Sequence, residues 1–379
     1  MLDPFPPPSS WLQNAVRPYA EAVDLYTLPD HLHEVLFAYL FYQTIEAFVS
    51  PWLSALLFPK VYQKLSPRTR INWDVHVVSL LQSCLINAMA LRFMFVDKER
   101  AGMKQSAVER VYGYTGAGGM IQALACGYFI WDLIVSTRYI KIFGIGIWFH
   151  AVSALCVFSF GFRPFVNFYA PVFILYELST PFLNIHWFCD KLNLTGGKLQ
   201  WYNGITLLVT FFCSRLLWGT FQSFSVFNDV WNVMQATKPG VQDVLSIFVP
   251  RDLELCLGDK SCVKAHAEVM KYAAVAVSRP VPAWMALTFL TSNMILHTLN
   301  FYWFGRMIET VRKRFQGKEH DEFKHERERR QSLVEELATG LDEDEISGPK
   351  TPPAEELLAQ AVTSTSSKSE EKAGLTKRR

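Results

Sequence analysis

Long apolar runs separated by short polar segments make up most of the chain. A helix needs about 20 mostly apolar residues to cross a bilayer. The runs that approach this length are residues 35–57, 73–96, 118–136, 144–162, 165–188, 202–224 and 283–304. Trp or Tyr stands at several of their ends, as is typical of the membrane interface. Because such runs rarely recur in soluble proteins, the pattern predicts an all-α integral membrane protein with about seven transmembrane helices.

The two ends of the chain differ from this apolar body. In residues 1–34, Leu12, Val16, Tyr19 and Val23 recur at helical spacing and predict a short helix. Two placements are open for it: on the membrane surface, or packed against the end of the helix bundle. Residues 305–379 are charged and then rich in Ser, Thr and Pro, so we expect a charged and largely disordered cytosolic tail.

Charge adds an orientation to this picture. The net charge is only +2, which gives no sign of a nucleic-acid-binding surface. Residues 59–72 carry four basic side chains and no acidic one, and a second basic segment begins at Gly305. Because short basic loops stay in the cytosol, both segments are expected there. Seven spans then place the amino terminus in the lumen.

Cysteine usage fits a lumenal loop. Cys256 and Cys262 lie in the sequence CLGDKSC, within residues 225–282 on the predicted lumenal side, where two cysteines can form a disulfide. The other five cysteines lie in or beside the apolar runs and are expected to be packing residues. Zinc would need two further ligands, and none is near. We therefore predict no metal and no cofactor.

Ionisable side chains inside the apolar runs are the candidate chemistry. Each costs about 2.5–3.5 kcal/mol in a bilayer, so it normally faces a protein interior or a wet cavity. Alternating helix directions place His76, Asp132, His150 and His297 at a similar depth on the cytosolic side. Asn300 joins this layer.

The segment YELSTPFLNIHWFCDKL, residues 176–192, adds a polar stripe. Glu177, Thr180, Asn184 and Trp187 recur on one helical face, and Pro181 predicts a kink. Glu177 and Arg215 are expected closer to the midplane, where they can pair. We infer a polar chamber lined by His76, Glu177, Thr180, Asn184, Arg215, His297 and Asn300. The alternative is that these groups only link helices.

Five sequence blocks resemble a known family. In order they are INWDVHVVS (71–79), GYFIWDL (127–133), IWFHAVSAL (147–155), YELSTPFLNIHW (176–187) and WYNGITLLVTFFCSRLLWG (201–219). Together they resemble the TLC domain, named for the TRAM, Lag1 and CLN8 proteins. The ELSTPF block is most similar to the TLC domain-containing protein 4 type. The resemblance covers about residues 67–304. It implies a membrane protein, commonly of the endoplasmic reticulum, with a barrel-like bundle of helices around a lipid-facing cavity.

The same resemblance bears on activity. Ceramide synthases of this family use two adjacent histidines and acidic residues to transfer a fatty acyl group to a sphingoid amine, but here the pair is Phe149-His150. Our leading hypothesis is therefore a protein that binds membrane lipid in the chamber and affects lipid composition. One alternative is acyl transfer from acyl-CoA, with His150 as base and Asp132 orienting it. Another is a structural or trafficking partner that acts through its tail.

Overall fold

Helices form all of the regular structure that the computed structural model describes, and no strand occurs in that part of the chain. The described residues are 1–236, 260–265, 267, 272, 281–315 and 329. The helices of the first half are α1 (Ser10–Ala22), α2 (Leu28–Thr44), α3 (Ser50–Leu57), α4 (Pro59–Tyr62), α5 (Pro67–Val96), α6 (Lys98–Met103), α7 (Ala107–Tyr112), α8 (Gly116–Arg138) and α9 (Ile140–Phe143). Those of the second half are α10 (Ile145–Phe160), α11 (Ala170–Ile174), α12 (Thr180–Lys191), α13 (Lys198–Phe211), α14 (Gly219–Ala236) and α16 (Ala283–Phe315).

Within the described part of the chain, three helical segments are both long and apolar enough to cross a membrane. They are α5, α8 and the continuous helix Lys198–Gln235. This agrees with the predicted all-helical membrane protein. The remaining predicted spans are also mainly helical, although α10 has only 16 residues. The number of seven spans stays a prediction.

Two pairs of consecutive α-helices are joined without a break by a π-helical stretch, whose turns are wider than those of an α-helix. A π-helical stretch, Ile45–Val49, joins α2 to α3, and another, Phe212–Trp218, joins α13 to α14. Such turns change which side chains face a neighbouring helix and often occur at functional sites. Arg215, a predicted chamber residue, lies in the second stretch, and Glu46 lies in the first.

The fifth apolar run is not a single helix. It passes through 3₁₀ turns at Asn167–Tyr169 and Leu175–Ser179, with α11 between them and α12 after them. Pro181 lies in the first turn of α12, where a missing N–H breaks no helical hydrogen bond. The irregular segment therefore precedes the proline instead of centring on it.

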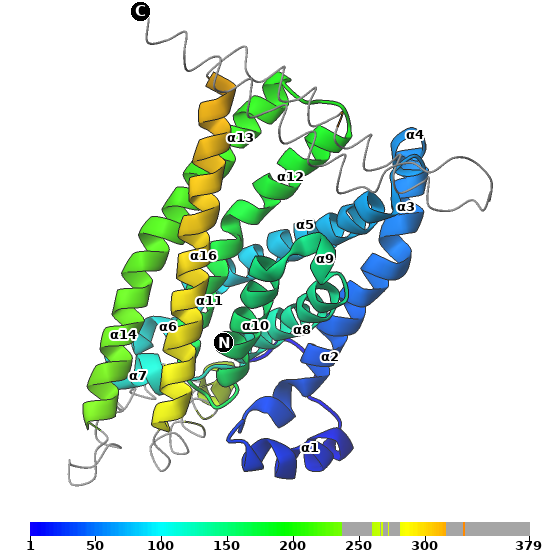
Figure 1. Ribbon diagram of the computed structural model, residues 1–379. Coiled ribbons are helices and arrows are strands. Elements are labelled where there is room, and N and C mark those ends of the chain that lie inside the picture. The colour runs from blue at the N-terminus through cyan, green and yellow to red at the C-terminus, as the bar shows by residue number, and fades with distance from the viewer. Residues whose placement is uncertain (237–259, 266, 268–271, 273–280, 316–328, 330–379) are drawn as a thin grey trace, which may run out of the picture. The chain divides into compact units, whose positions relative to one another are not determined.

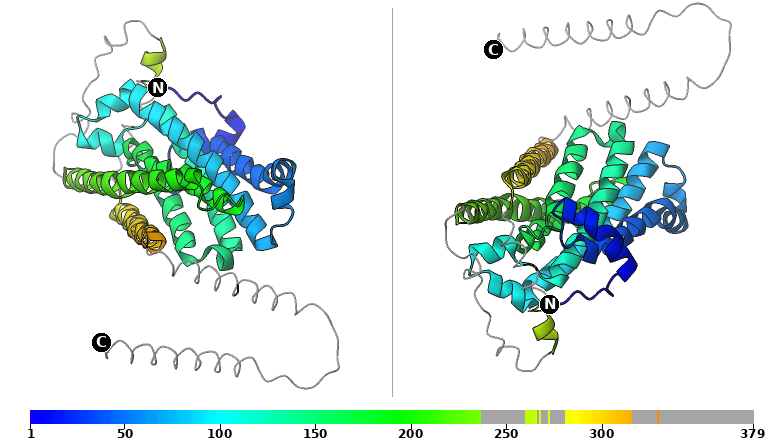
Figure 2. Two further views of the ribbon diagram at one scale, coloured as in Figure 1. Left: turned by 90° about the horizontal axis from the view of Figure 1, so that it is seen from above. Right: turned by 90° about the horizontal axis from the view of Figure 1, so that it is seen from below.

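Helix α8 is the buried centre of the bundle and packs against α2, α5 and α10 (Figures 1 and 2). Gly127 allows the approach of α2, because a Cβ there would lie 2.4 Å from the Val35 carbonyl oxygen and 2.7 Å from Ala38 Cβ. Small residues permit such close crossings in membrane proteins, where van der Waals contact drives helix association. Trp131, one turn further on, is fully buried and donates its indole N–H to Glu46 over 3.2 Å.

The long helix α13–α14 lies beside α16 (Figure 1). Polar side chains join the two at intervals of about one to two turns. Ser223 donates to Asn293 over 2.9 Å, Thr220 contacts His297 Nε2 at 2.8 Å, and Arg215 donates to Asn300 over 3.1 Å. The polar residues of α16 therefore face a neighbouring helix.

The predicted amino-terminal helix is present as α1, and the Ser9 hydroxyl accepts from the backbone N–H of Leu12 at its start. Ala20 is buried, and α1 contacts α2. Trp11 and Tyr19 are each 76% exposed, so part of the apolar face remains open. The tail beyond residue 315, which we predict to be cytosolic, lies almost entirely outside the described residues, and so does Cys256. Cys262 is disulfide-bonded, whereas the five other described cysteines are free thiols.

Candidate functional site

Four of the residues predicted to form the site line one cavity between the helices. His150 comes from α10, Glu177 from the 3₁₀ turn Leu175–Ser179, Arg215 from the π-helical stretch and Asn300 from α16. The polar lining is completed by Gln82, Tyr176 and Asn293, and aromatic side chains such as Phe129 and Phe173 supply apolar walls. The volume open to the centre of a water-sized sphere is about 40 Å³. At about 10–15 Å³ per water, this cavity holds a few water molecules.

Arg215 forms hydrogen bonds with three residues around this chamber. Its Nε donates to the Ser179 hydroxyl over 3.1 Å, and Nη2 donates to the Thr180 hydroxyl over 2.9 Å. Its Nη1 donates to Asn300, and the guanidinium carbon lies 5.0 Å from the centre of the Phe211 ring. Each guanidinium nitrogen therefore has a partner, which offsets the cost of burying the charge.

Glu177 balances the charge of Arg215. One carboxylate oxygen lies 3.5 Å from Arg215 Nη2, and the other accepts from the Thr180 hydroxyl over 2.7 Å. Thr180 thus accepts from the arginine and donates to the glutamate. The pair presents little net charge to the cavity, while its oxygen atoms remain able to accept hydrogen bonds.

His150 and Asp132 lie together, but not as a hydrogen-bonded pair. His150 Nδ1 is 3.9 Å from Asp132 Oδ2, beyond hydrogen-bond distance. The imidazole is flanked by Trp303 and Phe129, whose ring centres lie 5.7 and 6.4 Å away. Asp132 does not line the cavity.

The other predicted residues divide between separate contacts. His76 Nδ1 lies 2.6 Å from Asn184 Oδ1, and its ring stacks on Trp187 with centres 4.2 Å apart. Asn184 also donates to Ser79 over 3.1 Å. His297 contacts Thr220, as described above. The expected layer is therefore divided: His76 and Asn184 join α5 to α12, His297 joins α14 to α16, and none of the three lines the cavity.

Some polar lining residues were absent from the sequence-based list. Gln82, Tyr176 and Asn293 are uncharged at neutral pH. A search for side chains whose charge is costly in a bilayer therefore did not select them. Asn293 and Asn300 are separated by seven residues, two helical turns, and this spacing would have placed both on one face of α16.

A second buried polar cluster lies near the start of α2. His31 Nδ1 is 2.8 Å from Glu34 and 3.4 Å from Asp3, and His31 Nε2 is 2.5 Å from the Tyr114 hydroxyl. Asp3, His31 and Glu34 offer metal-ligand atoms within 4.8 Å of one another. Both imidazole nitrogens already have protein neighbours, so the arrangement is explained by hydrogen bonding. Burial, together with the neighbouring Glu34 carboxyl group, raises the pKa of Asp3 to about 7.

Comparison with known proteins decides the family. A family model described as the TLC domain matches residues 72–309. The chain belongs to the TLC domain family. It is 36% identical over 306 residues to an uncharacterized TLC domain-containing protein of Schizosaccharomyces pombe, which covers 81% of this chain and 87% of the relative.

Two further relatives carry informative names. The chain is 29% identical over 289 residues to Topoisomerase I damage affected protein 4 of Saccharomyces cerevisiae, covering 75% of this chain and 85% of the relative. It is 29% identical over 178 residues to human TLC domain-containing protein 4, covering 46% of this chain and 65% of the relative. The suspected resemblance is thus confirmed, and the chain is an integral membrane protein of this family.

The cavity falls wholly within the matched TLC domain, since its lining runs from Gln82 to Asn300. Within the TLC domain, Phe149 is 45% exposed and does not line the cavity, whereas its neighbour His150 does. Successive residues on a helix point about 100° apart, so positions 149 and 150 meet different surroundings.

Proposed function

We propose that this TLC-domain protein is a seven-span protein of the endoplasmic reticulum that binds a membrane lipid in its polar chamber and affects lipid composition. The observation that supports this most is the convergence of His150, Glu177, Arg215 and Asn300 on one cavity from four different elements. Ionisable groups at membrane depth are costly. Hydrogen bonds within the protein explain Arg215, but no polar group among the described residues lies within hydrogen-bond distance of His150.

The chemistry of the chamber favours an uncharged polar head group. Glu177 offsets the charge of Arg215, and the guanidinium nitrogens already have protein partners. The groups left for a ligand include the imidazole of His150, the amide NH₂ of Asn293, whose oxygen already accepts from Ser223, and the hydroxyl of Tyr176. Hydroxyl or amide groups of a lipid would complement these donors and acceptors.

The size of the chamber limits what enters it. About 40 Å³ accommodates a few atoms in place of water, so acyl chains would remain against the apolar helix surfaces. Binding would therefore be a contact between a lipid head group and the chamber mouth. A lipid with a larger head group could enter only if the chamber widened.

Lipid analysis after gentle purification tests this proposal. Full-length protein is extracted with its bound lipids, and these are identified by mass spectrometry. A polar lipid enriched over the bulk membrane is expected, with enrichment lost in His150→Ala. Phe149→Ala is the matched control, because its side chain is exposed and outside the cavity. Equal lipid profiles for wild type and His150→Ala would contradict the proposal.

Acyl transfer is the second candidate, favoured by the proximity of His150 to a carboxylate. A separation of 3.9 Å leaves room for Asp132 to approach the imidazole when substrate binds. In that reaction an acceptor amine or alcohol attacks the carbonyl carbon of the acyl thioester, and the imidazole removes the proton of the attacking group. The carbon–sulfur bond breaks, and CoA leaves as the thiol. Purified protein given acyl-CoA and a sphingoid amine should then form amide, and His150→Ala should form none. Equal amide formation by both proteins would exclude this role for His150.

A further inference from the structure

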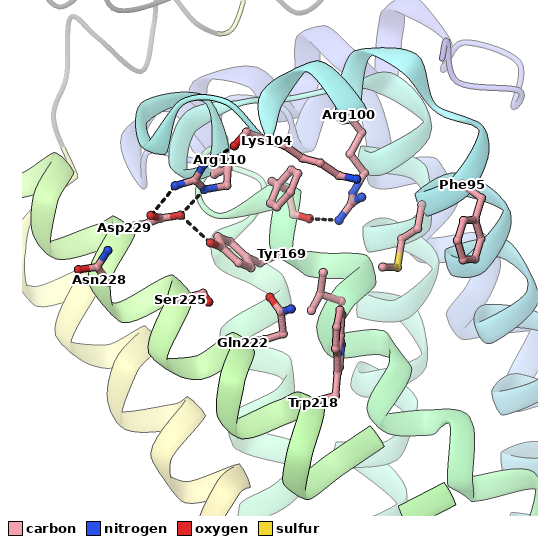
Figure 3. Close-up of a pocket in the computed structure, with 13 residues that line it drawn as sticks. Phe95, Arg100, Lys104, Arg110, Tyr169, Trp218, Gln222, Ser225, Asn228 and Asp229 are labelled. Atoms are coloured by element: carbon pink, nitrogen blue, oxygen red, sulfur yellow. Dashed lines mark hydrogen bonds and ion pairs between the residues drawn. The ribbon is translucent and has the colours of Figure 1, made fainter. Parts of the chain in front are cut away.

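A second and larger hollow lies between the α5–α6–α7 segment and the face of α14, and it shares no residue with the chamber (Figure 3). Its volume, measured in the same way, is about 480 Å³, which lies in the usual range of ligand pockets. The hollow is lined by Met94, Phe95, Arg100, Lys104, Arg110, Phe168, Tyr169, Val172, Trp218, Gln222, Ser225, Asn228 and Asp229. Neither the sequence blocks nor the charged residues of the spans predicted it.

One end of the pocket is cationic. Arg110 donates to both oxygens of Asp229 over 2.5 and 2.7 Å, and the Tyr169 hydroxyl donates to the same carboxylate, so this pair is balanced. Arg100 and Lys104 remain as lining cations without an acidic partner in the lining. Asp97, the carboxylate that acts on Arg100 from outside the lining, is already paired with the Met1 ammonium group at 2.8 Å. The balance of charge at this end is therefore positive, and it favours an anionic group.

Arg100 is the strongest evidence for a ligand. It is only 3% exposed, its guanidinium carbon lies 4.3 Å from the centre of the Phe168 ring, and Nη2 donates to the Phe168 carbonyl over 3.2 Å. Its Nε is buried and has no hydrogen-bond partner among the described residues. A buried donor without an acceptor costs about 1–3 kcal/mol, more for a charged group. Burial lowers the pKa of Arg100 to about 10, so the side chain is still cationic at neutral pH.

The opposite end of the pocket is apolar and open. Phe95 is 85% exposed and Trp218 is 37% exposed, and Met94 and Val172 add further apolar side chains to the lining. On the long helix, Trp218, Gln222, Ser225 and Asp229 follow at intervals of one turn along one face. Polarity thus rises along roughly 16 Å of helix, at 1.5 Å per residue, from an indole ring to a carboxylate. Figure 3 shows this gradient from Trp218 to Asp229.

We propose that this pocket binds an anionic glycerophospholipid. The phosphate would lie against Arg100 and Lys104, the glycerol oxygens beside Gln222 and Ser225, and the acyl chains along Phe95 and Trp218. Phosphate oxygens satisfy an arginine donor by charge-assisted hydrogen bonds. A water-soluble phosphate would use the cationic end but leave the exposed rings of the other end uncovered.

Native mass spectrometry of the full-length protein in detergent tests this site. Dioleoyl phosphatidic acid is the probe, and glycerol 3-phosphate and dioleoylglycerol separate the contribution of the phosphate from that of the chains. The proposal predicts that phosphatidic acid binds at least about tenfold more tightly than either, a difference of about 1.4 kcal/mol. Equal binding of glycerol 3-phosphate would identify a soluble-anion site, and equal binding of dioleoylglycerol would identify an unspecific apolar groove. Either result would overturn the proposal.

Charge reversal locates the binding. Lys104→Glu places a negative charge at an exposed lining position and should weaken phosphatidic acid binding about tenfold or more. Lys98→Glu is the matched control, because Lys98 is also exposed and lies in α6, but outside the lining. Arg100→Gln should also weaken phosphatidic acid binding. If that variant does not fold, Lys104→Glu alone tests whether the cationic end binds the phosphate. Equal losses in Lys104→Glu and Lys98→Glu would show a general surface-charge effect and overturn the proposal.

Discussion

The Thr180 hydroxyl lies between Arg215 and Glu177, accepting from the guanidinium over 2.9 Å and donating to the carboxylate over 2.7 Å. One hydroxyl thus connects two opposite charges that are themselves 3.5 Å apart. The arrangement joins the irregular segment before α12 to the long helix α13–α14. It also fixes part of the chamber wall, because Glu177 and Arg215 both line the cavity with His150.

Removal of Arg215 should destabilise the protein strongly. Arg215→Met leaves Glu177 buried without its cation, and breaking such a pair costs about 3–5 kcal/mol. The double variant Arg215→Met with Glu177→Gln should recover part of this loss, since no uncompensated charge remains. Thermal unfolding in detergent measures all three proteins. A double variant no more stable than Arg215→Met would show that the charge pair is not the cause.

Gly127 should tolerate no larger side chain. Gly127→Ala places a Cβ 2.4 Å from the Val35 carbonyl oxygen, so α2 and α8 must separate, at a cost of about 1–3 kcal/mol. Gly305→Ala is the matched control within α16, where nothing lies within 4 Å of the added atom. It should be neutral or stabilising by up to about 1 kcal/mol, because alanine favours helix. The order of the two melting temperatures checks the prediction, and equal values would contradict it.

The attachment of the amino-terminal segment should weaken as pH rises. The folded-state pKa of Asp3 is raised from 3.8 to about 7, chiefly by burial, so folding favours its protonated form. This contribution is fully present below about pH 4 and is lost as pH rises through about 7. Hydrogen exchange of residues 1–9 should therefore quicken between pH 5 and pH 8, after correction for the intrinsic pH dependence of exchange. Asp3→Asn should reduce this excess, and Glu34, whose pKa burial also raises to about 7, should account for the remainder. An unchanged excess in that variant would assign the effect to another group.

The apolar pattern predicted most of the helices because the bilayer leaves backbone groups few alternatives to helical hydrogen bonds. It also led to the pairing of Glu177 with Arg215, since the cost of charge at membrane depth favours opposite partners. The break before Pro181 was not visible, because 3₁₀ and α-helical turns use the same apolar residues. The two π-helical stretches were missed for the same reason.

Long-range contacts explain the other omissions. Asp3 and Tyr114 approach His31 only in the folded chain, and no local spacing indicates their meeting. Likewise, Arg100 and Lys104 lie outside the apolar runs and drew no attention, although tertiary packing places them with Trp218 and Gln222 in the lining of one pocket. The uncharged amides Gln82 and Asn293 carried no sign of their role, because neutral polar groups are common in membrane helices.

Cryo-electron microscopy of the full-length protein, purified with native lipids and reconstituted in a lipid nanodisc, tests the central claim most directly. The account predicts lipid density whose polar end lies within hydrogen-bond distance of His150 or Asn293 at the chamber. His150→Ala should lose this density, whereas Phe149→Ala should retain it. A chamber that holds only water in wild-type protein, with every ordered lipid on the outer helix surfaces, would contradict the account.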